Sequence, residues 1–242
     1  MRTVLSIGMG DITDDETPDA ADGEPRSRGA RALPWVAGAA VIVVIALGVY
    51  LLWPRTPDHV LLVGDSVSYV SYTEITEAFG PDVKVEPITR PGYTSSQLLP
   101  LTVKAIDDRE KSGEPLDRAI VLVGYNDAWT GNVQTQDLNT MVDEIARYQC
   151  SIWLTIPARP SGQHPGAGDF DPAHGEAWND RVRTLVNEKK NIHLVDEWEK
   201  TVNDSEPGQY LIPDGIHPND AGKAKLAEIM HDNLESACRF AR

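Results

Sequence analysis

From residue 58 onward, short apolar runs that favour strands alternate with longer amphipathic stretches that favour helices. The predicted strands are 59–64, 83–88, 119–124, 151–156 and 191–196, and the predicted helices are 67–79, 96–112, 135–148, 175–189 and about 219–240. This alternation is typical of βαβ units, which build a parallel sheet covered by helices on both faces. We therefore expect an α/β fold whose ligands bind beyond the carboxyl ends of the strands.

Residues 34–53 form an uncharged apolar segment, PWVAGAAVIVVIALGVYLLW. About 20 apolar residues span a bilayer core, and Trp35, Tyr50 and Trp53 lie near the two ends, where interfacial aromatic residues are found. We interpret the segment as a single transmembrane signal-anchor helix. A cleaved signal peptide is one alternative, although the run is longer than usual and no small-x-small cleavage site follows it. A buried core helix is the other.

The charges around this segment predict its orientation. Three arginines, at positions 26, 28 and 31, precede it, and only Arg55 follows closely. We therefore expect a cytoplasmic N-terminus and an extracytoplasmic domain at 58–242, reached through a linker at 54–57. Residues 11–24 hold seven acidic side chains and no large apolar residue after Ile12, so we expect 1–33 to be a disordered acidic tail. The net charge of −15 argues against a nucleic-acid partner.

Five polar or glycine residues are expected to meet at one edge of the sheet. Ser66, Gly92 and Asn126 follow the first three predicted strands, and Asp214 and His217 precede the last helix. A serine hydroxyl becomes a nucleophile when a histidine removes its proton, and a carboxylate orients that histidine. Asp214 and His217 are three residues apart, so they face the same way if their turn is helical.

Three of these positions also offer hydrogen-bond donors for an oxyanion. They are the backbone N–H groups of Ser66 and Gly92 and the side-chain amide of Asn126. Taken singly, Ser66 also fits a helix N-cap, Asn126 and Asp214 fit turns, and His217 fits the approach to a helix. Their joint order along one sheet edge favours catalysis.

The motifs that carry these residues resemble a known family. GDS at 64–66, the isolated Gly92, GYND at 124–127 and DGIHPN at 214–219 resemble the four signature blocks of the SGNH, or GDSL, hydrolases. The resemblance covers about residues 58–240 and implies a flavodoxin-like three-layer α/β/α fold. The G-x-S-x-G motif of the ordinary α/β-hydrolases is absent.

The resemblance also implies a role for each matching residue. Ser66 would be the nucleophile, His217 the base and Asp214 its orienting acid. Ser66, Gly92 and Asn126 would form the oxyanion hole. The implied reaction is ester hydrolysis through an acyl-enzyme, without a cofactor.

Two positions depart from the family pattern. The first block reads GDSVS instead of the common GDSL, and Tyr125 stands where many members have a second glycine. We expect Tyr125 to narrow or line the substrate pocket, and Tyr69 and Trp129 are further pocket candidates because they also follow strand ends. Ordinary partial burial is the alternative for all three.

Asp65 and a cluster of four possible metal ligands are predicted to have structural and not catalytic roles. Asp65 is expected to hold its loop by hydrogen bonding. Asp169, Asp171, His174 and Glu176 are all legitimate metal ligands, but we favour a solvated acidic loop before a helix N-terminus, where carboxylates suit the helix dipole. We therefore predict no metal site.

The two cysteines are predicted to form a disulfide. Cys150 begins the fourth predicted strand, at the edge opposite the candidate site. The last helix starts at the site edge and runs back for about 20 residues, roughly 30 Å, which carries Cys238 to that opposite edge. Two free buried thiols are the alternative. A disulfide would fit an oxidising compartment.

Together these observations predict a membrane-anchored, extracytoplasmic serine esterase. Its location suggests O-acyl groups of envelope polysaccharides, or lipid esters, as substrates. An O-acyltransferase with the same triad is the nearest alternative. A non-catalytic envelope-binding module of the same fold is the alternative from a different class.

Overall fold

The computed structural model describes residues 58–133, 135–158 and 170–239. They belong to one compact unit, Thr56–Arg242. The predicted acidic tail, the apolar segment at 34–53 and the linker lie outside the described residues. Within the described ranges, no helix is long and apolar enough to cross a membrane.

The centre of this unit is a five-stranded sheet in the order β2-β1-β3-β4-β5, and every neighbouring pair is parallel. The strands are β1 (Asp58–Gly64), β2 (Val83–Thr89), β3 (Arg118–Leu122), β4 (Cys150–Leu154) and β5 (Ile192–Val195). This is the flavodoxin-like order, and it confirms the predicted parallel α/β fold. In such a sheet the order reverses beside β1, which opens a crevice at the carboxyl ends of the strands.

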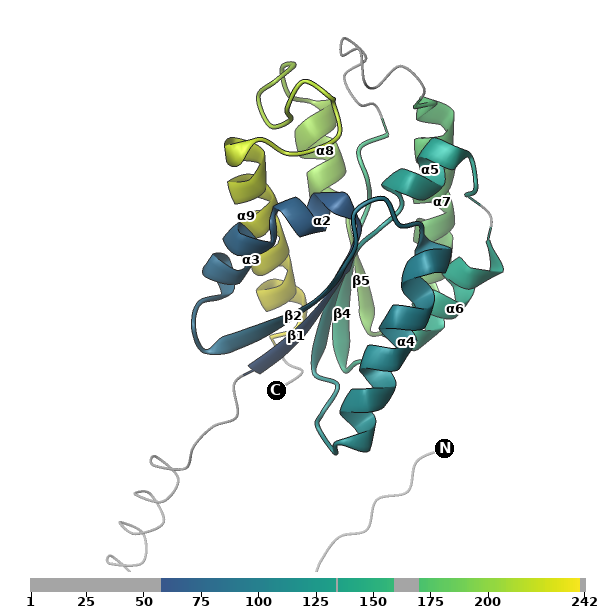
Figure 1. Cartoon of the computed structure of the whole chain (residues 1–242), viewed down its shortest axis with the longest axis vertical. Coiled ribbons are helices and arrows are strands. Elements are labelled where there is room, and N and C mark those ends of the chain that lie inside the picture. The colour runs from purple at the N-terminus through teal and green to yellow at the C-terminus, as the bar shows by residue number, and fades with distance from the viewer. Residues whose placement is uncertain (1–57, 134, 159–169, 240–242) are drawn as a thin grey trace, which may run out of the picture. The chain divides into compact units, whose positions relative to one another are not determined.

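Helices cover both faces of the sheet, as Figure 1 shows. They are α2 (Ser66–Val70), α3 (Tyr72–Phe79), α4 (Ser95–Lys111), α5 (Tyr125–Thr130), α6 (Gln136–Ile145), α7 (Pro172–Asn187), α8 (Glu197–Asn203) and α9 (Asp220–Ala237). On one face α3 packs against α9, which also contacts α8. On the other face α4 packs against α6, and α7 contacts both α5 and α6. The three-layer arrangement is therefore present.

The central strands are buried on both faces. Every residue of β3 and β4 is buried, and so are the last six residues of β1. The edge strand β2 instead alternates between covered and exposed side chains. Continuous apolar runs are what a parallel sheet between two helical layers requires, which explains why these strands could be recognised in the sequence.

The predicted helix at 67–79 is wrong in one respect, because the structure divides it into α2 and α3 at Ser71. The Ser71 hydroxyl donates to the Val67 carbonyl over 2.9 Å, and its backbone N–H donates to the Tyr69 carbonyl. A serine that bonds back to the preceding turn competes with the regular helix pattern. The short helices α5 and α8 were not predicted, since six or seven residues are too few to show a clear helical period.

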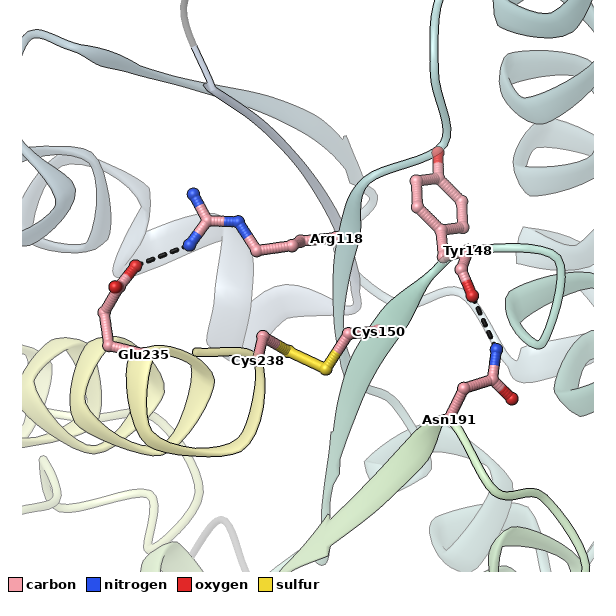
Figure 2. Close-up of a disulfide and its surroundings, with 6 residues drawn as sticks. All are labelled: Arg118, Tyr148, Cys150, Asn191, Glu235 and Cys238. Carbon is pink, nitrogen blue, oxygen red and sulfur yellow. Dashed lines mark hydrogen bonds and ion pairs between the residues drawn. A yellow bond between two sulfur atoms is a disulfide. The ribbon is translucent and has the colours of Figure 1, made fainter. Parts of the chain in front are cut away.

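The predicted disulfide between Cys150 and Cys238 is confirmed. Figure 2 shows that it joins the start of β4 to the end of α9. Beside it, the buried Arg118 of β3 forms an ion pair with Glu235 of α9. The C-terminal end of α9 is therefore attached to the sheet by one covalent bond and one ion pair.

Candidate active site

A continuous series of hydrogen bonds joins three of the predicted residues. The Ser66 hydroxyl lies 2.8 Å from Nε2 of His217, and Nδ1 of His217 lies 2.6 Å from Oδ2 of Asp214. With a neutral imidazole, Nδ1–H donates to the carboxylate and Nε2 accepts from the hydroxyl. All three side chains are half-buried, so they remain open to solvent and to a ligand.

Ser66 owes its position to the end of β1. It is the first residue of α2, and Asp65 is the N-cap of that helix. Oδ1 of the buried Asp65 accepts the Val67 N–H over 3.1 Å, and Oδ2 accepts the Tyr125 N–H over 3.3 Å. The expectation that Asp65 holds its loop is therefore confirmed. The same carboxyl group also ties this loop to the start of α5.

Asp214 and His217 are brought together by a turn that is not helical, as the alternative interpretation of Asp214 as a turn residue predicted. Oδ1 of Asp214 accepts the backbone N–H groups of Ile216 and His217, each over 2.9 Å. Aspartate side chains stabilise tight turns in this way. Burial disfavours the charged form of Asp214, but these two N–H groups and His217 outweigh it and lower the pKa of the carboxyl. Asp214 is therefore held as a carboxylate beside the imidazole.

The loop between β3 and α5 ends with a glycine that no other residue can replace without strain. Gly124 has a φ of +128°, and a Cβ atom there would lie 2.0 Å from Nε1 of Trp178. The indole of Trp178 is fully buried and donates to the Val123 carbonyl. The chain can therefore turn into α5 only because position 124 has no side chain.

Asn126 and Asp127 connect this loop to the loop that carries Gly92. Nδ2 of Asn126 donates to the Tyr93 carbonyl over 2.9 Å. The buried carboxylate of Asp127 accepts the backbone N–H of Ser95 over 2.8 Å and its hydroxyl over 2.7 Å. Sequence reasoning missed Asp127, although its place in the GYND motif was a signal. The two side chains fix the start of α4 and the glycine loop against α5.

The two backbone donors predicted for an oxyanion lie on these connected loops. Gly92 is exposed and has a φ of +77° in the left-handed region, which glycine adopts without strain. Ser66 is in the first turn of α2, where backbone N–H groups have no partner within the helix. Neither N–H donates to any acceptor among the described residues.

The structure separates the three predicted pocket residues. Tyr125 is wrong as a pocket residue, because its side chain is in the core and its hydroxyl accepts a hydrogen bond from Nε1 of Trp198 over 2.9 Å. Trp129 is half-buried and packs against Phe170. Tyr69 is 54% exposed. With Tyr72 and other residues it lines a cavity of about 450 Å³ between α2, α3 and the end of β2.

A larger cavity of about 580 Å³ lies along α4, with Asp137 of α6 on its far side. None of the predicted site residues lines it. The cavity beside Tyr69 is therefore the better candidate for a substrate pocket, because Tyr69 and Ser66 are three residues apart on α2 and share a helix face.

The acidic group before α7 has structural contacts. Oδ1 of Asp171 accepts the Ala173 N–H over 2.9 Å and caps α7, as expected of a carboxylate at a helix N-terminus. The imidazole of His174 contacts the Ala128 carbonyl. Asp169 lies outside the described residues. Among the residues described, no three His, Cys, Asp or Glu side chains are grouped as metal ligands.

Burial raises the pKa of the Asp65 carboxyl from 3.8 to about 7, although its two N–H donors oppose the shift. Between about pH 4 and pH 7 the folded state therefore keeps a proton that the unfolded state has lost, so stability falls as pH rises, by at most about 1.4 kcal/mol per pH unit. We expect the stability of Asp65→Asn, whose side chain cannot ionise, to lack this fall between about pH 4 and pH 7. Urea unfolding of both proteins across that range measures it, and parallel stability curves would contradict it.

Comparisons with known proteins identify the family and the fold of this chain. The model of the GDSL-like Lipase/Acylhydrolase family matches residues 62–225. Comparison with curated protein sequences finds no match. Among solved structures, a lipase/acylhydrolase from Enterococcus faecalis has a TM-score of 0.57 at 18% identity, covering 74% of this chain and 96% of that chain.

Two further solved structures have a similar fold. The C-terminal catalytic domain of peptidoglycan O-acetyltransferase A from Streptococcus pneumoniae has a TM-score of 0.54 at 16% identity, covering 77% of this chain and 96% of that one. TesA has a TM-score of 0.54 at 22% identity, covering 74% and 99%. The family match spans about two thirds of the sequence, including the GDS segment and the loop before α9. This chain therefore belongs to the GDSL-like lipase/acylhydrolase family and is a serine hydrolase of the SGNH type.

Proposed function

We propose that the chain hydrolyses carboxylic esters through a Ser66–His217–Asp214 triad. The observation that carries this proposal is the hydrogen-bonded series from the Asp214 carboxylate through His217 to the Ser66 hydroxyl, with distances of 2.6 and 2.8 Å. A serine that only caps a helix has no need of an imidazole on its hydroxyl, nor of a carboxylate on that imidazole.

In the first half of the reaction, Ser66 Oγ attacks the ester carbonyl carbon while Nε2 of His217 takes the hydroxyl proton. Asp214 stabilises the imidazolium that forms. The carbonyl oxygen gains negative charge, and the N–H groups of Ser66 and Gly92 and the amide of Asn126 donate to it. An amide nitrogen carries two hydrogens, so Asn126 can hold the Tyr93 carbonyl and the oxyanion together.

In the second half, the imidazolium gives its proton to the leaving alcohol, and an acyl-enzyme remains on Ser66. His217 then takes a proton from water, whose oxygen attacks the acyl carbon. Collapse of the second tetrahedral intermediate releases the carboxylic acid and returns the proton to Ser66. The residues present supply every proton transfer, so the cycle needs no cofactor.

The setting of this reaction is a separate part of the proposal. The uncharged segment 34–53 and the arginines before it support a membrane anchor with the hydrolase domain outside the cytoplasm. A disulfide between Cys150 and Cys238 is consistent with an oxidising compartment. O-acyl groups on envelope polysaccharides, or lipid esters, are the substrates that such an anchor would place within reach.

Labelling with a fluorophosphonate tests the nucleophile directly. The reagent phosphonylates an activated serine with loss of fluoride, so we expect one adduct on the full chain, located to Ser66 by peptide mass spectrometry. Ser66→Ala should abolish the adduct, and Ser68→Ala, which changes a buried serine in the same motif, should keep it. No adduct on the folded chain, or an adduct that survives Ser66→Ala, would refute the proposal.

An acyl-enzyme can also pass its acyl group to a sugar hydroxyl. Hydrolysis of p-nitrophenyl acetate by the full chain, followed with and without an added oligosaccharide acceptor, separates the two outcomes. We expect free acetate as the main product in both cases. Acetylated acceptor as the main product would instead identify an O-acyltransferase, with Ser66 in the same role.

A further inference from the structure

We infer that the cavity beside Tyr69 binds the alcohol part of the substrate, and that Arg90 there pairs with an anionic group, a carboxylate or a phosphate, on that alcohol. This inference rests on the proposed ester hydrolysis and adds a substrate class to it. Three observations support it: the position of the cavity, its aromatic wall, and the lack of a carboxylate partner for Arg90 among the described residues.

The cavity lies where a leaving alcohol has to go. Arg90 directly follows β2, and its backbone N–H donates to the Gly64 carbonyl over 3.1 Å, so it lies beside the end of β1 and close to Gly92. The cavity wall also includes residues of α3, which packs against α9. His217 comes from the loop before α9. The proton donor for the alcohol and the cavity are therefore on the same face of the sheet.

The wall of the cavity offers apolar and aromatic surface for a ring. Tyr69 and Val70 are among the most exposed large apolar residues described, at 54% and 37%. Tyr72 is held in place by its hydroxyl, which donates to the Val85 carbonyl over 3.0 Å. Tyrosine combines a large contact face with little conformational freedom, which suits the binding of a sugar or an aromatic ring.

Arg90 is the only charged residue among the seven described residues that line the cavity. It is exposed, and one guanidinium N–H donates to the Thr89 carbonyl over 2.7 Å. It forms no ion pair with any carboxylate in the described ranges. Arg109, Arg118, Arg147 and Arg183 each pair with at least one carboxylate, whereas Arg181 and Arg239, like Arg90, have no ion pair among the described residues.

Arg90 therefore has no carboxylate partner among the described residues, although the chain holds 37 acidic residues and a net charge of −15. Its planar guanidinium fork matches carboxylate and phosphate geometry, and charge-assisted bonds of this kind are stronger than neutral ones. The negative net charge would otherwise repel an anionic substrate. The one cation among the described residues of the cavity lining therefore selects for an anionic group on the bound alcohol.

Three acetyl esters with closely related leaving groups test the inference on the full chain. p-Acetoxybenzoate carries a carboxylate, p-acetoxyphenyl phosphate carries a phosphate, and methyl p-acetoxybenzoate is neutral. Each kcat/KM is divided by the spontaneous hydrolysis rate of the same ester, which removes differences in intrinsic reactivity. We expect Arg90→Gln to lower the charged-to-neutral ratio about tenfold, and added salt to lower it in the unmodified chain.

Lys84→Gln is the matched control. It also removes one positive charge, but near the start of β2, at the end opposite to Arg90, so the ratio should stay unchanged. Tyr69→Ala should instead lower kcat/KM for charged and neutral esters alike. The ester whose ratio responds more strongly to Arg90→Gln identifies the anion as carboxylate or phosphate.

Binding to the Ser66→Ala variant keeps the test independent of turnover. With calorimetry, we expect p-acetoxybenzoate or its phosphate counterpart to bind about tenfold more weakly when Arg90→Gln is added. The inference would be overturned if Arg90→Gln changed neither the charged-to-neutral ratio of kcat/KM nor the affinity measured by calorimetry. If Ser66-dependent hydrolysis of the neutral ester then persisted, the proposed function would still stand.

Discussion

Replacing His217 with alanine is expected to lower kcat/KM for p-nitrophenyl acetate by about 10⁴- to 10⁶-fold. Without the imidazole, nothing removes the Ser66 proton during attack or returns one to the leaving group. Asp214→Asn should cost about 10⁴-fold, because it leaves the ring in place but no longer fixes its tautomer. Steady-state rates on the full chain measure both losses.

A double variant shows whether Ser66 and His217 act together as parts of a triad or contribute to the rate independently. The double variant, Ser66→Ala with His217→Ala, should be no slower than the slower of the two single variants. The losses of rate are not additive when residues act as a unit. His231→Ala is the control, since His231 packs against Phe79 and pairs with Asp232 on α9, away from Ser66. Losses that multiply in the double variant, or a large loss from His231→Ala, would contradict the triad.

Breaking the disulfide is expected to have the largest effect on stability. Cys150 and Cys238 are separated by 88 residues, and closing a loop of that length removes chain entropy worth about 4.6 kcal/mol from the unfolded state. We therefore expect reductant to lower the free energy of unfolding of Thr56–Arg242 by about 4.6 kcal/mol. Urea titrations with and without reductant, followed by tryptophan fluorescence, measure the difference.

Cys150→Ser with Cys238→Ser is the control for that experiment. Its stability should match that of the reduced protein and should not respond to reductant. The catalytic rate of the reduced protein, measured well below its unfolding midpoint, should stay close to that of the oxidised protein, because the bond is at the opposite end of α9 from His217. A change in stability below about 1 kcal/mol would show that the ion pair of Arg118 and the packing of α9 suffice without the bond.

The parts of the fold that could be predicted are those with local signals. A strand buried on both faces is a continuous apolar run, so β1 and β3 and the residues that follow them could be located. Once the strands are parallel, Ser66 and Asn126 must lie at one edge. The disulfide follows from the same reasoning, because a helix of known length ends at a known distance from its start.

The failures concern contacts between residues far apart in the chain. Tyr125 and Trp198 are 73 residues apart, and only their hydrogen bond in the core decides that the tyrosine points away from the pocket. The contact of Asp127 with Ser95 is equally remote, at 32 residues. The kind of turn at Asp214 was left open for a different reason. A spacing of three residues suits both a helical turn and a side-chain-capped turn, and sequence spacing cannot separate them.

The loop after β3 has a consequence for engineering. Tyr125, Asn126 and Asp127 are consecutive, and each side chain bonds a different neighbour: the Trp198 indole, the Tyr93 carbonyl and the start of α4. Random libraries at these positions should therefore yield mostly inactive or poorly folded clones. The exposed side chains of Tyr69 and Val70 on α2 hold no such partners in the described residues, so substitutions there should change substrate binding and leave the triad in place.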